Sequence, residues 1–172
     1  MSDAAQVTFA EGYRPGVIGR ITELHGVFYA HEWGVGAEFE SQMAREICDF
    51  VEGYDPERDL LLSASVNGVI VGCIAILRPE TGSEEARLRW FLLDPRCQGR
   101  GIGRQLLVRA LRFARERYAK CYLWTVTGLP QSMHLYERFG FTPVAFETDS
   151  RYGSELKSVR MILDLAAVED LP

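Results

Sequence analysis

The stretch DPRCQGRGIGRQLL, residues 94 to 107, most constrains the fold, because its glycine-rich loop joins two segments of different periodicity. Before the loop, residues 85–93 (EARLRWFLL) predict a strand. After it, apolar residues recur at the spacing of one helical face and predict a helix near 103–118: Leu106, Leu107, Ala110, Leu111 and Ala114. A strand, a tight loop and a helix in this order predict a sheet covered by helices.

The predicted strand 85–93 changes character along its length. In its first half Ala86, Leu88 and Trp90 alternate with charged residues, so we expect these three side chains to share one face. Its second half is apolar throughout, as in a central strand covered on both faces. The pattern therefore predicts a strand in the middle of the sheet.

The remaining segments complete the order βααβββαβαββ. Strands are predicted at 7–13, 60–66, 69–77, 120–127, 142–148 and 155–165, and helices at 17–33, 38–54 and 131–139. Asn67-Gly68, between two apolar β-branched runs, is a strong hairpin signal. This order predicts a single domain over residues 1–172 of the α/β class (α+β type), with about seven strands in a mixed sheet and about four flanking helices.

Composition argues against several classes of protein. The net charge of -5 disfavours whole-molecule attraction to nucleic acid or to an anionic membrane. The sequence contains no run of about 18 apolar residues, so no transmembrane helix is expected. The N-terminal segment also lacks a signal-peptide pattern, and we therefore expect a cytoplasmic protein. The four cysteines have no metal-ligand spacing, so no metal is expected.

The glycine loop predicts a site for an anion. Backbone N–H groups at a helix N-terminus lack internal partners, and glycines let a ligand approach the chain closely. The loop does not match the dinucleotide fingerprint G-x-G-x-x-G, and the lysine of a Walker loop is missing. Taken alone, the loop leaves open a glycine-rich turn that holds no ligand.

Three segments in order resemble the GCN5-related N-acetyltransferases, the GNAT superfamily. The run Gln98-Gly99-Arg100-Gly101-Ile102-Gly103 is similar to the family's acyl-CoA loop, Q/R-x-x-G-x-G/A. FLLDP (91–95) resembles the end of the family's fourth strand, and LYERFGF (135–141) resembles its L-Y-x-x-x-G-F segment. The resemblance covers about residues 7 to 165 and implies the GNAT fold, with a mostly antiparallel sheet.

The N-terminal part resembles a narrower group. YRPGVIGRITELHGVFYAHEWG (13–34) and FVEGYDPERD (50–59) look like the acetyltransferase half of regulators that fuse a MarR-type DNA-binding domain to a GNAT domain. Because no winged-helix segment precedes it in this sequence, the resemblance implies a stand-alone enzyme that does not bind DNA.

The resemblance implies transfer of an acetyl group from acetyl-CoA to a primary amine by direct attack in a ternary complex. It assigns the CoA pyrophosphate to the loop amides of Gly99, Arg100, Gly101, Ile102 and Gly103, with Gln98 and Arg104 beside them. The pantetheine arm would pair with the backbone of Leu92 and Leu93. Tyr136 would be the acid that protonates the leaving thiolate.

The group that takes the amine's proton is less defined. Glu85 is the candidate base, directly or through a water, and His31 is its rival. The alternatives for Glu85 are an exposed carboxylate at a strand end or an ion pair with Arg87 or Arg89. The alternative for His31 is an exposed histidine at a helix end.

The acceptor is a small-molecule or peptide amine, and its identity is not readable from the sequence. Aromatic and acidic residues of the first helix are candidates for its pocket: Phe28, Tyr29, Glu32 and Trp33. The family's asparagine after strand five is absent from TVTGLPQS (125–132). Either Ser132 or backbone groups substitute for it, or the affinity for the cofactor is weaker.

Two other classes of function remain open. A non-catalytic acyl-CoA-binding module would keep the loop without needing Tyr136, and a nucleotide-binding protein of another kind would prefer ATP or NAD. A homodimer formed through the last two strands is also possible.

Overall fold

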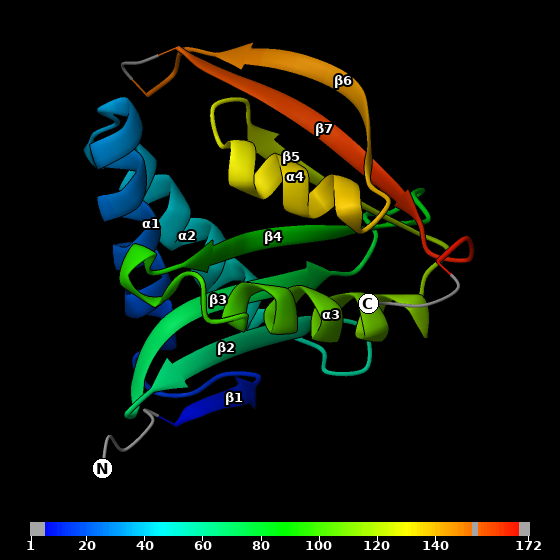
Figure 1. The fold of residues 1–172 in the computed structure, drawn as a ribbon, viewed down its shortest axis with the longest axis horizontal. Coiled ribbons are helices and arrows are strands. Elements are labelled where there is room, and N and C mark those ends of the chain that lie inside the picture. Colours follow the sequence, from blue (N-terminus) through cyan, green and yellow to red (C-terminus); the bar gives the residue numbers. More distant parts are fainter. Residues whose placement is uncertain (1–5, 153–154, 169–172) are drawn as a thin grey trace.

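The computed structural model describes residues 6–152 and 155–168, which contain one seven-stranded sheet in the order β1-β2-β3-β4-β5-β7-β6 (Figure 1). The strands are β1 (Val7–Glu11), β2 (Leu60–Val66), β3 (Val69–Leu77), β4 (Glu85–Leu93), β5 (Lys120–Val126), β6 (Thr142–Asp149) and β7 (Leu156–Asp164). The helices are α1 (Val17–Trp33), α2 (Ala37–Glu52), α3 (Ile102–Arg115) and α4 (Pro130–Arg138), with a short 3₁₀ helix at Pro95–Cys97. The predicted order of elements and the mixed α/β fold are confirmed.

Most differences from the predicted bounds lie at element ends. β1 stops at Glu11, before Gly12, which adopts a φ of 76° and donates its N–H to the carbonyl of Leu61 at 2.8 Å. α3 starts one residue earlier than predicted and ends at Arg115. The predicted hairpin is confirmed, since Asn67 and Gly68 have φ values of 52° and 80°, as a two-residue type I′ turn requires.

The two faces of the sheet bury separate cores. Leu60, Leu62 and Ala64 of β2 point toward α3 and join a cluster that also contains its apolar stripe. Leu61 points to the opposite face and joins a second cluster with α1 and α2, which includes Ile21. The period of two along β2 therefore separates a face covered by α3 and α4 from a face covered by α1 and α2.

β4 and β5 are the only parallel neighbours in the described sheet, and they pair over a short length. Their register joins Glu85 to Lys120, Ala86 to Cys121 and Arg87 to Tyr122, and no pairing follows. Figure 1 shows the two strands diverging beyond this point. The second half of β4 therefore has a neighbouring strand on its β3 side alone.

A β-bulge in β4 corrects two expectations about this strand. Cys73 pairs with Leu92 and Ala75 with Arg89, so two residues of β4, Trp90 and Phe91, oppose one of β3. Trp90 has a φ of 48° and packs in the α1 and α2 core. The alternation that would group Trp90 with Ala86 and Leu88 was therefore wrong.

The expectation of cover on both faces was wrong for the end of β4. Phe91, Leu92 and Leu93 are each partly exposed, because β5 has moved away and no element covers that side completely. The apolar run lines a cleft there.

Within the described residues, no helix is long and apolar enough to cross a membrane. The same residues contain no group of three or more His, Cys, Asp or Glu side chains that could hold a metal ion. Cys73 and Cys121 are fully buried, whereas Cys48 is partly exposed. Cys97 packs partly buried against the larger core and does not line the cleft.

Candidate functional site

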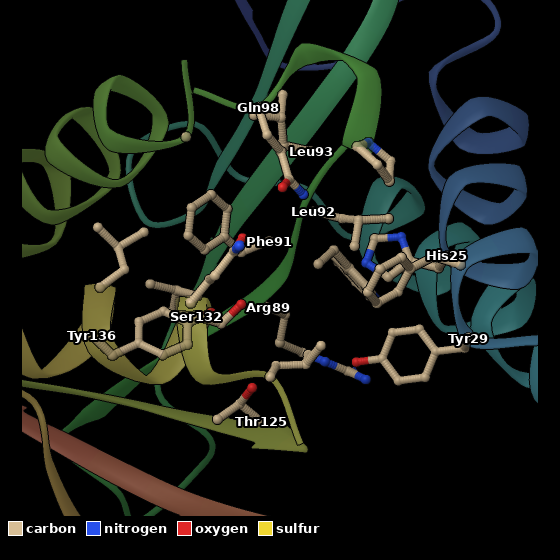
Figure 2. Close-up of a pocket in the computed structure, with 18 of the residues that line it drawn as sticks. His25, Tyr29, Arg89, Phe91, Leu92, Leu93, Gln98, Thr125, Ser132 and Tyr136 are labelled. Carbon is tan, nitrogen blue, oxygen red and sulfur yellow. The ribbon is translucent and has the colours of Figure 1, made fainter. Parts of the chain in front are cut away.

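A cleft of about 740 Å³ opens where β4 and β5 diverge (Figure 2). One wall comes from α1 and α2, the floor from β4 and β5, and the other wall from α4. The glycine loop before α3 forms one end. Side chains from six elements distant in the sequence thus meet at one site.

Asp94 fixes the chain where β4 enters the glycine loop. Its carboxylate accepts hydrogen bonds from the backbone N–H of Arg96 at 3.0 Å and from the guanidinium of the same residue at 3.0 and 2.6 Å. The hydrogen bond from the Arg96 side chain is the main cause that lowers the pKa of the Asp94 carboxyl. Arg20 of α1 lies 3.8 Å from the same carboxylate, so the loop is also connected to the opposite wall.

The loop turns sharply at two glycines. Gly99 and Gly101 have φ values of 73° and 72°, which residues with a side chain rarely adopt. α3 begins at Ile102, and no side chain caps its N-terminus, so the first N–H groups of the helix lack partners within it. Those groups and the positive end of the helix dipole make this end of the cleft suited to an anion.

Six of the seven predicted loop residues line the cleft. They are Gln98, Gly99, Gly101, Ile102, Gly103 and Arg104. Arg100 is the exception, because it does not line the cleft. Leu92 and Leu93, predicted to hold the pantetheine arm, line the middle of the cleft next to this loop.

Beyond the bulge, β4 presents a strand edge to the cleft. Leu92 pairs with Cys73 and Leu93 with Gly72 on the β3 side, while no strand pairs with them on the β5 side. An unpaired strand edge is a template for an extended ligand, which forms main-chain hydrogen bonds as an added strand would. The exposed backbone of this segment can therefore hold a linear molecule.

Tyr136 of α4 faces this edge from the opposite wall. Its ring is 5% exposed and packs edge-on against Phe91, at a centroid distance of 6.1 Å, and Phe141, at 5.7 Å. No hydrogen bond occupies its hydroxyl within the described residues. Burial raises the pKa of the hydroxyl, so Tyr136 remains protonated at neutral pH and can donate a hydrogen bond or a proton.

Ser132 lies on the same helix as Tyr136 and also lines the cleft (Figure 2). It is the side chain that we expect in place of the family's asparagine. Thr125 at the end of β5, 7% exposed, is a second hydroxyl on this wall. The α4 side of the cleft therefore has hydroxyl groups but no charged group among these residues.

The two candidate bases do not lie with Tyr136. Glu85 stands at the opposite end of β4, outside the cleft lining, and its carboxylate forms an ion pair with Arg160 of β7. This partner was not predicted, since the expected ion pair involved Arg87 or Arg89. The His31 side chain is 83% exposed, contacts Glu32 at 2.9 Å and does not line the cleft.

The structure brings a different histidine to the cleft. His25 of α1 is 4% exposed, and its Nδ1 lies 2.8 Å from the carbonyl oxygen of Ile21, which makes Nδ1 the donor and leaves Nε2 as an acceptor. Burial is the main cause that lowers the pKa of His25 to about 4. The available signal in the sequence was a polar residue four positions after Ile21 on the apolar stripe of a helix.

Three of the four residues predicted for an acceptor pocket line the cleft. Phe28, Tyr29 and Glu32 line the cleft, whereas Trp33 packs behind it against Tyr29 at a centroid distance of 5.0 Å. Figure 2 shows Tyr29 across the cleft from Tyr136, with Arg89 on the floor between them. The wall from α1 is therefore aromatic, and the floor carries charge.

Parts of the sequence are similar to two acetyltransferases. The sequence is similar to an N-acetyltransferase of Escherichia coli named YjgM and described as uncharacterized, 36% identical over 84 residues, which are 46% of this chain and 48% of that protein. It is also similar to mycothiol acetyltransferase of Beutenbergia cavernae, 32% identical over 101 residues, which are 58% of this chain and 33% of that protein. The matches thus span half or less of these relatives.

The fold matches solved structures over nearly the whole chain. The putative acetyltransferase yncA of Salmonella typhimurium, solved with its cofactor acetyl-CoA, superposes with a TM-score of 0.74 at 20% identity, covering 96% of this chain and 98% of that one. The sequence model of the acetyltransferase (GNAT) family matches residues 20–141, well over half of the sequence. The chain therefore belongs to the acetyltransferase (GNAT) family.

Proposed function

We propose that the protein is an N-acetyltransferase that moves the acetyl group of acetyl-CoA to a primary amine by direct attack in a ternary complex. The observation that carries this proposal is the position of the free Tyr136 hydroxyl opposite the unpaired edge of β4, in a cleft that begins at a helix N-terminus. Binding groups and a proton donor thus line one continuous surface.

The glycine loop would hold the CoA pyrophosphate. The unpartnered N–H groups at the start of α3 offer hydrogen bonds, and the side chains of Gln98 and Arg104 line the same end of the cleft. This donor set fits two negatively charged phosphates. The resemblance also assigns the backbone N–H of Arg100 to this set, although Arg100 does not line the cleft.

The edge of β4 would hold the pantetheine arm and the thioester. Main-chain groups of Leu92 and Leu93 would pair with the arm's amides as a neighbouring strand would. A backbone N–H beyond the bulge would donate to the thioester oxygen as negative charge develops there. The bulge at Trp90 supports this role because it interrupts regular pairing next to the segment.

The chemical step needs one proton donor and one route for a proton to leave. The amine nitrogen attacks the thioester carbon, a C–N bond forms and the C–S bond breaks. Tyr136 gives its proton to the departing thiolate and recovers one from solvent, while the proton lost by the amine leaves through water in the cleft. The products are an amide and CoA with a free thiol.

His25 is the best-placed residue to orient that water. Its Nε2 is an acceptor beside Leu92 and Tyr29, and a pKa of about 4 keeps the ring neutral at physiological pH. Because His25 is such a weak base, it would not retain the proton of the acceptor amine. The amine would therefore enter the cleft largely in its neutral form. The separation of Glu85 and His31 from the cleft lining argues against either as the direct base.

Three further features belong to this proposal. We infer kinship with the acetyltransferase half of the MarR-fused regulators from the likeness of residues 13–34 and 50–59. A cytoplasmic location fits four cysteines without a disulfide. A homodimer through β6 is supported by the exposed side chains of Val144 and Phe146 on that edge strand, 52% and 72% exposed.

The test combines binding and turnover. Calorimetric titration with acetyl-CoA, with CoA, ATP and NAD as controls, is expected to show binding by acetyl-CoA and CoA alone. Release of the CoA thiol during a screen of amines measures turnover. In Tyr136→Phe we expect turnover to fall by about 100-fold or more, with acetyl-CoA affinity retained, because one proton donor is lost and the ring remains.

Tyr118→Phe is the matched control. It removes a hydroxyl that donates to the carbonyl of Arg58, outside the cleft, so turnover should persist. Full turnover in Tyr136→Phe would contradict the acid role. Tight acetyl-CoA binding with no turnover of any amine would indicate a binding module in place of an enzyme.

A further inference from the structure

The floor of the cleft carries two arginines side by side. Arg87 and Arg89 project from β4 before the bulge, on the face opposite Ala86 and Leu88, and both line the cleft. A second hollow of about 320 Å³ shares Arg87, Arg89 and Trp124 with the cleft as lining residues. This end of the floor lies away from the glycine loop along β4.

The two arginines differ in their partners. Arg89 forms an ion pair with Glu46 of α2 at 2.5 Å. The Nε of Arg87 is buried and has no hydrogen-bond partner, and no described carboxylate lies within ion-pair distance of its guanidinium. Its guanidinium carbon lies over the Tyr122 ring, 5.8 Å from the ring centroid.

The neighbouring carboxylates are already engaged. Glu46 pairs with Arg89, Glu85 with Arg160, and Glu32 on the α1 wall contacts His31. Glu80 lines the second hollow as an exposed side chain and attracts Arg87 from beyond ion-pair distance. A half-buried cation next to a second cation thus lacks a close anion of its own.

This arrangement disfavours the charged form of Arg87. Burial, and then the charge of Arg89, lower the pKa of Arg87, which means that both oppose its positive charge. A planar guanidinium matches a carboxylate through two parallel N–H···O bonds, and such bonds gain strength where water is partly excluded. An anionic group of the acceptor would supply the missing partner.

Resting on the proposed acetyl transfer, we propose that the acceptor is an amino acid whose carboxylate binds the guanidinium of Arg87. The amine then lies toward Tyr136 and Leu92, while the carboxylate lies toward the Arg87 end of the floor. Aromatic side chains of Tyr29 and Trp124 line the cleft beside this path. Among the described residues, the floor has no unpaired carboxylate that could bind the second amine of a polyamine.

The experiment compares matched acceptors. Glutamate, methionine, phenylalanine and lysine are each tested beside the α-carboxamide of the same amino acid, with spermidine as an acceptor that has no carboxylate. Binding to the CoA-loaded protein is measured by calorimetry, and turnover by release of the CoA thiol. The amide has the more readily deprotonated amine, so a preference for the free acid reports recognition of the carboxylate.

We expect kcat/KM for at least one free amino acid to exceed that of its amide by about tenfold to a hundredfold, the range of a charged hydrogen-bonded contact. In Arg87→Gln this ratio should fall to about one, mainly through KM, while acetyl-CoA affinity stays unchanged. Arg87→Lys keeps the positive charge but lacks the two parallel N–H donors of the guanidinium, so it should recover part of the ratio. Arg112→Gln removes an exposed charge on α3 and should leave the ratio as it was.

The outcomes separate this inference from the proposed reaction. Turnover of amines with equal rates for acid and amide, or a preference that Arg87→Gln does not alter, overturns the carboxylate site and leaves acetyl transfer standing. Arg87-dependent binding of an amino acid without any turnover supports the carboxylate site and overturns the reaction. Failure of every amino acid in the panel to bind overturns the site.

Discussion

The substitution His25→Gln tests whether the cleft holds a neutral histidine. His25 is 4% exposed, and Nδ1 donates to the carbonyl of Ile21 at 2.8 Å. Burial is the main cause that lowers its pKa to about 4, and the charge of Arg89 adds to it. Glutamine keeps a donor near the carbonyl of Ile21 but cannot titrate, so the variant isolates the ring's ionisation.

The expected size follows from proton linkage. The unfolded chain, with a histidine pKa near 6.5, binds a proton between about pH 6.5 and 4 that the folded protein refuses, so stability falls as pH falls through that window. Each pH unit within the window costs about 1.4 kcal/mol. Between pH 7 and pH 5 this one residue should remove about 2 kcal/mol, a large share of a typical domain's 5–15 kcal/mol.

Urea unfolding at pH 7 and pH 5 measures the effect. The loss of unfolding free energy between the two pH values should be about 2 kcal/mol smaller in His25→Gln than in the unaltered protein. His31→Gln, which changes an exposed histidine on the same helix, is the control and should follow the unaltered protein. Equal pH dependence in His25→Gln and the unaltered protein would show that His25 is not held neutral.

Two glycine substitutions test how the backbone shapes the site. Gly101→Ala should lower acetyl-CoA affinity at least about tenfold and cost about 1–2 kcal/mol of stability, because Gly101 has a φ of 72°. Calorimetry measures the affinity and urea unfolding measures the stability. Unchanged affinity would show that the loop is not part of the binding site. Gly72→Ala should cost about 1–3 kcal/mol and also weaken acetyl-CoA binding, because its Cβ would lie 2.9 Å from Cδ1 of Leu93 and 3.0 Å from the carbonyl oxygen of Leu92. Full stability in Gly72→Ala would mean that β4 shifts at little cost.

The order and type of the elements were predictable because local patterns carry them. Asn67-Gly68 fixes its hairpin through two positive φ values, which are properties of those two residues. The helix after the glycine loop follows from an apolar stripe at a period of 3.6. The glycine loop was predictable for the same reason, because a run of glycines directly before a helix is a signal contained in a few neighbouring residues.

The bulge and the ionic contacts of the site were not predictable from local pattern. Alternation along EARLRWFLL groups Trp90 with Leu88, and the shift appears only when β3 pairs with β4. Glu85 is paired with Arg160, which lies 75 residues later in the sequence. The ion pair that argues against Glu85 as the base therefore depends on the order of the strands in the sheet. His25 resembled any polar residue on a helix until α1 packed against the cleft.

The short parallel pairing of β4 with β5 links these features. If the two strands stayed paired past Arg87, the N–H and C=O groups of Leu92 and Leu93 would be used within the sheet, and Tyr136 would have no open edge to face. Because they diverge, a sheet that is otherwise continuous keeps a row of unpaired main-chain groups at its centre. Buried polar groups need partners, so this segment of β4 is stable when water or an extended ligand satisfies it. The same divergence leaves the Arg87 guanidinium beside the open space, which is why the peptide-like arm and the acceptor would meet at one gap in the sheet.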